Sequence, residues 1–227
     1  MQKDLWESEY REKQGIPSSR TMFPSRALKK FWESEELNDL NMNNALDVGS
    51  GLGRNSIYMA QNGVKNVVGV EIVDYAIERA RQEVKQLELQ NKIKFINKSI
   101  GNPLPFENQS FDLIVDMMVM HLLNESERTV YFSEVQRLLR PNGYFVFYTI
   151  AANSEAAKAL FKSNPGPEAN SYIIPQSGMV EKAFTDEELK TSLPELEIVR
   201  LDHKVELTPA FDNVYEREYV SGVMKKI

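Results

Sequence analysis

The chain has 227 residues, of which 27 are Lys or Arg and 33 are Asp or Glu, so its formal net charge is −6. Hydrophobic residues make up 42% and charged residues 26%, a globular balance that excludes a disordered or fibrous chain. An acidic chain is a poor general binder of nucleic acid. The absence of cysteine excludes disulfides, thiolate metal sites and a cysteine nucleophile.

Targeting and metal signals are absent from the sequence pattern. The segment Met1–Arg11 is charged and lacks the apolar run of a signal peptide. The most apolar stretch, Leu113–Leu123, is short and interrupted by Asp116 and His121, so we expect no membrane span. With His203 the chain has only two histidines, which excludes a metal site built on several imidazoles. We therefore expect a cytoplasmic protein with no metal, membrane or nucleic-acid partner.

The first forty residues predict helices. Trp6 and Tyr10 are four positions apart, as are Ala27 and Phe31, and this spacing places each pair on one face of an amphipathic helix. We expect residues 1–43 to form an N-terminal helical cap.

Strands and helices alternate over residues 44–150. The expected strands are Asn44–Val48, Asn66–Val70, Lys92–Ile96, Phe111–Asp116 and Tyr144–Ile150, and the expected helices are Asn55–Gln61, Tyr75–Leu89 and Glu125–Leu139. Such alternation is typical of crossover units, which give an α/β fold with a mostly parallel sheet and helices on both faces.

The remainder of the chain has a different pattern. Residues 151–185 are polar and rich in Pro and Gly, as expected of a lid or substrate excursion over the rim of the sheet. Thr185 is a candidate N-cap for a helix over Phe184–Leu193. The last two strand-like runs, Leu196–Leu201 and Tyr215–Met224, have no helix between them, so they can pair as a hairpin. We predict one domain with a seven-stranded sheet whose last strand is antiparallel, residues 186–227 forming the final helix and hairpin.

The segment from Asp47 to Gly53 carries the strongest functional signal. Its glycines, Gly49, Gly51 and Gly53, stand between a strand and a helix, where they let the backbone approach a ligand. The dinucleotide fingerprint requires a further glycine where this chain has Arg54, which disfavours a pyrophosphate ligand. An acid such as Asp47 at the end of a strand suits a cationic amine instead.

The second strand ends in Glu71, 18 positions after Gly53. A carboxylate there can accept hydrogen bonds from both ribose hydroxyls, which keeps a nucleoside as the ligand. A nucleoside with a cationic amino-acid tail and no phosphate describes S-adenosylmethionine.

With these motifs, residues 44–150 resemble the class I S-adenosylmethionine-dependent methyltransferases. The resemblance implies a Rossmann-like fold, S-adenosylmethionine as methyl donor and S-adenosylhomocysteine as product. It also implies a set of cofactor contacts from the loops after the first four strands. The expected cofactor-binding residues are Asp47, Gly49, Ser50, Gly51, Gly53, Glu71, Ile72, Ser99, Ile100 and Asp116.

One position departs from the family pattern. Ser99 stands where an adenine-binding Asp is usual, and a hydroxyl accepts a hydrogen bond more weakly than a carboxylate. The backbone at Ile100 can hold the ring, so we expect looser adenine binding and the same cofactor.

Methyl transfer from a sulfonium requires mainly that a nucleophile be held close and in line. Asp116 and His121 are the candidate catalytic residues. Asp116 is expected either to orient or deprotonate a substrate, or to cap the next segment. For His121 the alternatives are a general base and a histidine whose nitrogens are satisfied by backbone.

Aromatic residues outside the core are the candidate substrate contacts: Trp6, Tyr10, Tyr148 and Tyr172. Their alternative role is ordinary packing. We predict a methyltransferase, a monomer or homodimer, that acts on an O, N or S atom of a small-molecule acceptor. A protein or peptide methyltransferase and a non-catalytic cofactor-binding protein remain the alternatives, and a nicotinamide oxidoreductase is disfavoured by Arg54.

Overall fold

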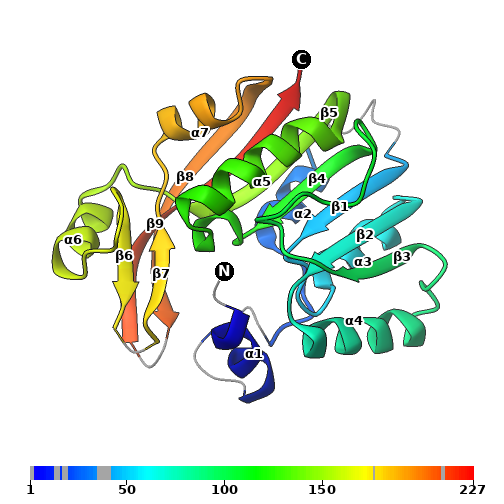
Figure 1. Cartoon of the computed structure of the whole chain (residues 1–227), viewed down its shortest axis with the longest axis horizontal. Helices are drawn as coiled ribbons and strands as arrows, with labels where there is room; N and C mark the ends of the chain where they lie inside the picture. The colour runs from blue at the N-terminus through cyan, green and yellow to red at the C-terminus, as the bar shows by residue number, and fades with distance from the viewer. Residues whose placement is uncertain (1–2, 13–15, 17–19, 35–41, 176, 211–212) are drawn as a thin grey trace.

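The computed structural model describes residues 3–12, 16, 20–34, 42–175, 177–210 and 213–227. In this part of the chain a seven-stranded sheet has the order β3-β2-β1-β4-β5-β9-β8 (Figure 1). Its strands are β1 (Asn44–Val48), β2 (Asn66–Glu71), β3 (Ile93–Asn97), β4 (Phe111–Met117), β5 (Leu139–Ile150), β8 (Leu196–Ala210) and β9 (Asn213–Lys226). Strands β1 to β5 are parallel to one another, whereas β9 is antiparallel to both β5 and β8. The predicted α/β fold with an antiparallel last strand is confirmed.

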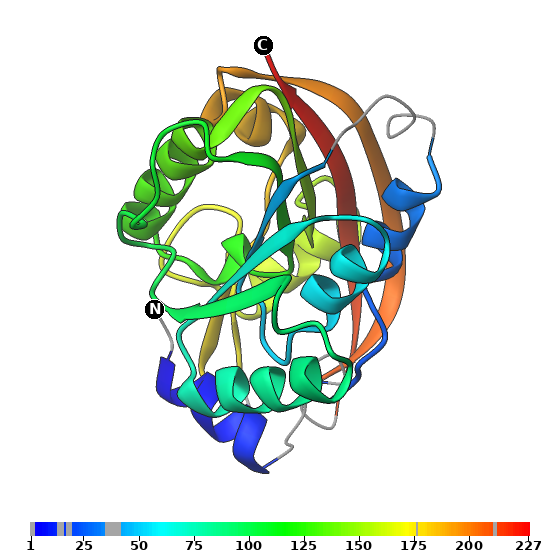
Figure 2. The same cartoon turned by 90° about the vertical axis from the view of Figure 1, so that its right-hand side faces the viewer.

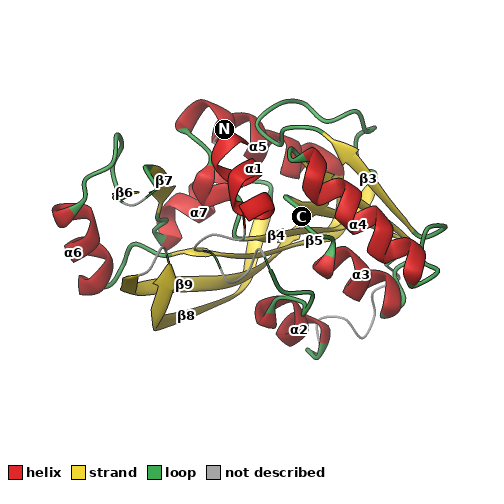
Figure 3. Cartoon of the chain, turned by 90° about the horizontal axis from the view of Figure 1, so that it is seen from below, coloured by secondary structure: helices red, strands yellow, loops and turns green. Residues whose placement is uncertain are grey.

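Helices cover both faces of the sheet (Figure 3). The described helices are α1 (Lys3–Glu12), α2 (Arg26–Trp32), α3 (Arg54–Gln61), α4 (Asp74–Gln86), α5 (Glu125–Leu138), α6 (Glu155–Ser163) and α7 (Asp186–Ser192). Helices α2, α3 and α4 bury their apolar sides in one hydrophobic cluster, and α5 and α7 bury theirs in another on the opposite face. The central strands are apolar on both faces because both are covered.

Side-chain caps fix where two of these helices begin. Asn124 and Glu127 form a capping box before α5, and Thr185 and Glu188 form one before α7. Each box satisfies two backbone N–H groups that have no partner inside the helix. The expected N-cap at Thr185 is therefore observed, and the helix it begins ends at Ser192.

The parallel part of the sheet creates a crevice between β1 and β4. The chain leaves β1 toward α3 on one face, while β4 is followed by a 3₁₀ turn, η3 (Met120–Leu122), and then by α5 on the other. Ligands of open α/β sheets bind outside the carboxyl ends of the strands at such a point of reversal. The fold thus predicts a site between the glycine loop and η3.

Two further units border this crevice, a small two-stranded sheet and α1. Residues 151–185 contain α6 and a two-stranded sheet, β6 (Ser171–Ile174) with β7 (Met179–Lys182), so the expected excursion is more regular than its composition indicated. Figure 1 shows α1 between this hairpin and α4. Helix α1 packs on α4 (Figure 2), where the Arg11 guanidinium carbon lies 5.0 Å from the centre of the Tyr75 ring.

Strands β5, β8 and β9 are longer than predicted. Strand β5 begins at Leu139, not Tyr144, because Leu139 already pairs with Phe111 of β4, before a register shift after which Tyr144 pairs with Leu113. Strands β8 and β9 extend well past the predicted runs, because polar residues such as Asp202 and Ser221 pair directly across an antiparallel ladder. Among the described residues, no helix combines the length and the apolar character needed to cross a membrane.

Candidate active site

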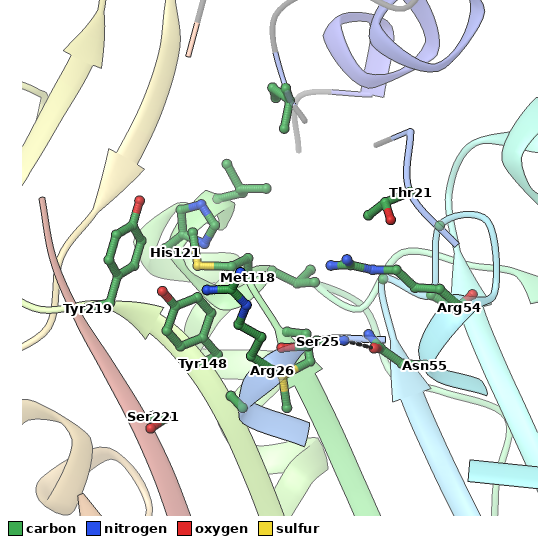
Figure 4. Close-up of a pocket in the computed structure, with 18 of the residues that line it drawn as sticks. Thr21, Ser25, Arg26, Arg54, Asn55, Met118, His121, Tyr148, Tyr219 and Ser221 are labelled. Atoms are coloured by element: carbon green, nitrogen blue, oxygen red, sulfur yellow. Dashed lines mark hydrogen bonds between the residues drawn. The ribbon is translucent and has the colours of Figure 1, made fainter. Parts of the chain in front are cut away.

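A cavity of about 1120 Å³ opens at the carboxyl ends of β1, β2 and β4. We call one side the glycine-loop wall, which carries Gly49, Ser50, Gly51, Leu52, Arg54, Asn55, Glu71, Ile72 and Ile100. The other side, the hairpin wall, carries Met118, His121, Leu122, Tyr148, Ile174, Met179, Glu181, Arg217 and Tyr219. Figure 4 shows Arg54 and Asn55 across the cavity from His121, Tyr148 and Tyr219.

The glycine loop has a backbone that other residues rarely adopt. Gly49 has a φ of +59° and Gly51 a φ of +53°, both in the left-handed region. A Cβ atom on Gly51 would lie 2.5 Å from the Tyr10 hydroxyl, and one on Gly49 would lie 2.5 Å from a methyl group of Val119. Gly53, at a φ of +81°, is the N-cap of α3 and faces Phe95. The backbone itself therefore forms this wall.

Two buried carboxylates hold the loop from behind and from the side. Asp47 is 1% exposed, lies behind the cavity wall and accepts a hydrogen bond from the Ser56 hydroxyl at 2.6 Å. Burial raises the pKa of Asp47 to about 7. Glu71 lies on the wall and accepts from the backbone N–H groups of Gly51 at 2.9 Å, Ile72 at 2.8 Å and Val73 at 3.0 Å.

The glycine-loop wall fits S-adenosylmethionine by its own donor set. The Ser50 hydroxyl is buried on this wall, and within the described residues it has no hydrogen-bond partner. This hydroxyl and the Glu71 carboxylate suit the amino-acid tail and the ribose of the cofactor. Ile100 and Ile72 line the cavity beyond them and offer apolar surface to a base.

Ser99 is placed differently from its neighbour Ile100. It does not belong to the cavity wall, and its hydroxyl accepts a hydrogen bond from the backbone N–H of Gly101 at 3.1 Å. The loop that follows is braced by α5: Arg137 donates to the carbonyl oxygens of Leu104 and Phe106, at 3.1 and 2.7 Å. Ser99 thus shapes the loop that presents Ile100.

Asp116 is fully buried at the end of β4 and does not line the cavity. Its carboxylate accepts hydrogen bonds from the backbone N–H groups of Val119 at 2.9 Å and Met120 at 3.1 Å, and from the Tyr131 hydroxyl at 2.8 Å. Burial raises its pKa to about 6. The observed geometry is the capping alternative, and it corrects the expectation of direct contact with substrate or cofactor.

His121 lies on the hairpin wall and is 3% exposed. Its Nε2 is 3.7 Å from Oε1 of Glu181, and within the described chain its Nδ1 has no hydrogen-bond partner. The alternative of a histidine satisfied by backbone is therefore not what the structure shows. Burial acts to raise the pKa of Glu181, but its interactions with His121 and Arg217 outweigh burial and lower that pKa.

Three of the four candidate substrate aromatics line the cavity. Trp6 and Tyr10 come from α1, with ring centres 5.9 Å apart, and Tyr148 stacks on Tyr219 at 5.1 Å. Burial raises the pKa of Tyr10 well above its ordinary value, with a further contribution from Glu71. Tyr172, the fourth, was expected to contact substrate but does not line the cavity. It lies behind the wall, 1% exposed, and its hydroxyl donates to Glu181.

Several wall residues have no distinguishing signal in the sequence. Glu181, Arg217 and Tyr219 come from β7 and β9, far from the glycine loop, and their spacing is that of ordinary strand residues. In the sequence, Arg54 differs from its neighbours only in replacing a glycine of the dinucleotide fingerprint. It lies on the cavity wall and donates to the carbonyl oxygen of Phe23 at 3.2 Å. Burial lowers the pKa of this guanidinium.

The sheet order, the glycine loop after β1 and the acid after β2 define a class I S-adenosylmethionine-dependent methyltransferase. A family model described as a methyltransferase domain matches residues 41–195, and the chain belongs to that family. A solved structure described as a SAM-dependent methyltransferase from Methanosarcina mazei superposes with a TM-score of 0.71 at 23% identity, over 84% of this chain and 95% of that one.

The chain matches only part of the length of its curated relatives. A sterol 24-C-methyltransferase of Pneumocystis carinii is 32% identical over 45% of this chain and 26% of its own length. A sarcosine/dimethylglycine N-methyltransferase of Aphanothece halophytica is 33% identical over 45% of this chain and 36% of its own length. The chain thus matches about a quarter to a third of these relatives, and their acceptors differ from one another.

Proposed function

We propose that this protein transfers a methyl group from S-adenosylmethionine to a small-molecule acceptor held against the hairpin wall. The observation that carries the proposal is the single cavity shared by the two walls. The named relatives that act on a sterol and on methylated glycines support a small-molecule acceptor. The cofactor supplies a methyl group already activated by its bond to a positively charged sulfur.

The glycine-loop wall would hold that cofactor by shape and hydrogen bonding. Gly49 and Gly51 leave room for the amino-acid tail, Ser50 offers its hydroxyl, and Glu71 offers its carboxylate to the ribose. Asp47 acts indirectly, because it bonds to Ser56 of α3 and fixes the strand end from which the loop departs. Fixing these donors before binding reduces the entropy lost on association.

Water exclusion is the main task of the remaining elements. Trp6 and Tyr10 of α1 cover the glycine loop, and Ile174 and Met179 of the β6–β7 hairpin close the opposite side with apolar surface. A displacement reaction in such a site keeps the nucleophile desolvated and in line, from which most of the rate can come. Asp116 contributes by positioning the turn that carries His121.

A protein or peptide acceptor is less compatible with this architecture. It would need an extended groove, whereas residues 151–185 contribute Ile174, Met179 and Glu181 to the cavity wall. A cofactor-binding protein without activity is the second alternative. Detection of S-adenosylhomocysteine formed from any acceptor would eliminate it.

The first experiment is calorimetric titration of the protein with S-adenosylmethionine, S-adenosylhomocysteine and NAD. We expect the first two to bind and the third not to bind. Binding of NAD alone would overturn the assignment of the glycine loop. Turnover of small-molecule acceptors, followed as S-adenosylhomocysteine formed, then tests the acceptor class.

A further inference from the structure

One buried polar atom on the hairpin wall is unexplained by the fold. Nδ1 of His121 is inaccessible to solvent and, in the described part of the chain, accepts and donates no hydrogen bond. Leaving such a group unsatisfied destabilises the folded state. Since the His121 side chain lines the cavity, a bound molecule that turns this ring or displaces its neighbours can become the partner of that nitrogen.

The other ring nitrogen faces a carboxylate that is itself firmly held. Glu181 of β7 has Oε1 3.7 Å from His121 Nε2, while Oε2 accepts from the Tyr172 hydroxyl and lies 3.3 Å from a guanidinium nitrogen of Arg217. These side chains are almost completely buried. A carboxylate beside Nε2 favours the tautomer with its proton on Nε2, which leaves a free lone pair on Nδ1.

The side chains around His121 and Glu181 are largely apolar, and their charges balance. Met118, Leu122, Ile174 and Met179 line the cavity beside His121, together with the stacked rings of Tyr148 and Tyr219. The negative charge of Glu181 is already matched by Arg217. A cationic amine would therefore find no free carboxylate here, whereas a flat apolar body would find matching surface.

We propose that His121 accepts the proton of an aromatic hydroxyl acceptor and that Glu181 is the positioning residue that orients it. The proposal rests on the proposed function and adds the acceptor class. An aromatic thiol is largely ionised near pH 8 and needs no base, but a phenol, with a pKa of about 10 like that of tyrosine, keeps its proton. Of these two acceptors, only the phenol needs a base with a free lone pair.

The step balances without any further reactant. The hydroxyl oxygen forms a bond to the methyl carbon as the bond from that carbon to the donor sulfur breaks, and the sulfur keeps the electron pair. The proton of the hydroxyl passes to Nδ1 of His121, which becomes an imidazolium beside Glu181. The products are an aryl methyl ether and S-adenosylhomocysteine, and the imidazolium then releases its proton to water.

A spectroscopic test needs no turnover. The chain has two histidines, so nitrogen-15 NMR of labelled histidine gives two sets of signals, which a His203→Gln variant assigns. We expect His121 to carry its proton on Nε2 in the wild type and to lose this single-tautomer state in Glu181→Gln. The matched control is Glu218→Gln. Glu218 lies 3.1 Å from Nδ1 of His203, so this substitution should change only the His203 signals. A His121 protonated on Nδ1 in the wild type would overturn the proposal.

A kinetic test uses two acceptors of the same shape, 2-naphthol and naphthalene-2-thiol, near pH 8. We expect His121→Asn to lower kcat for the naphthol about 100-fold or more, and Glu181→Gln to lower it about tenfold, within the range of general base catalysis. Both variants should change kcat for the thiol less than about threefold. Equal losses for the two acceptors would show a structural role and overturn the proposal.

The outcomes separate this proposal from the proposed function. Failure of the wild type to bind S-adenosylhomocysteine would contradict the proposed function itself. A protein that binds it but methylates 2-naphthylamine and not 2-naphthol, or none of the three, would contradict only the acceptor class. Calorimetry with S-adenosylhomocysteine on both variants shows whether each remains folded and keeps its cofactor side intact.

Discussion

Replacement of Gly51 by alanine tests the glycine-loop wall most directly. Gly51 has a φ of +53°, and an alanine held there loses about 1–2 kcal/mol to backbone strain. Its Cβ would also lie 2.5 Å from the Tyr10 hydroxyl oxygen, closer than any ordinary contact. Either the loop or α1 must move, so we expect the dissociation constant for S-adenosylhomocysteine to rise at least tenfold, which is about 1.4 kcal/mol.

A matched variant separates strain from the clash. Gly178 has a φ of +69°, and a Cβ atom there would have nothing within 4 Å. Gly178→Ala should therefore lose about 1–2 kcal/mol of unfolding free energy through strain alone, less than Gly51→Ala, and leave S-adenosylhomocysteine binding unchanged. Urea titration and calorimetry on the two variants give both quantities.

Removal of the Tyr10 hydroxyl should relieve the clash. In Tyr10→Phe the nearest ring atom, Cζ, would lie 3.4 Å from the new Cβ, which is ordinary van der Waals contact. The double variant with Gly51→Ala should thus recover part of the lost binding, while the backbone strain remains. Unchanged binding in Gly51→Ala, or no recovery in the double variant, would refute the assignment of this loop and of Tyr10 as its cover.

Further predictions concern stability. Burial raises the pKa of Asp47 from 3.8 to about 7, so the folded protein takes up a proton in that window and its free energy of unfolding falls as the pH rises through it. Asp47→Asn should flatten this slope, so that its free energy of unfolding gains up to about 4 kcal/mol relative to wild type between about pH 4 and pH 8. Glu155→Gln, at an exposed position, should leave the slope unchanged. An unchanged slope in Asp47→Asn would contradict a buried Asp47. Arg137→Lys removes donors to two loop carbonyls, so it should cost about 1–3 kcal/mol of unfolding free energy and weaken S-adenosylhomocysteine binding. The control Lys158→Ala, at an exposed ion pair, should cost less than about 0.5 kcal/mol. Equal costs for the two variants would argue against bracing of the loop by α5. Asn142→Gly, at a φ of +64°, should be neutral or gain up to about 1 kcal/mol in urea titration, and a clear loss would show that the asparagine side chain matters there.

Local patterns in the sequence determined the core of the fold and one wall of the cavity. Strand and helix periodicity depends on neighbours within a few positions, so the alternation from Asn44 to Ile150 predicted the parallel sheet and the place of its crevice. The glycine loop and Glu71 are also local signals, because a strand end, a positive φ and an acid at the next strand end are read from nearby residues. Both lie on the cavity wall as the motif places them.

The hairpin wall was decided by tertiary structure alone. Glu181 meets His121 across 60 positions of sequence because the β6–β7 hairpin folds back over η3, and no periodicity encodes that contact. Tyr172 and Asp116 show the same limit: each looked like a site residue, but packing turned their polar atoms toward Glu181 and toward the turn after β4. The physical reason is that sequence patterns specify which face of an element is buried, whereas the partner of a buried polar atom depends on how distant elements dock.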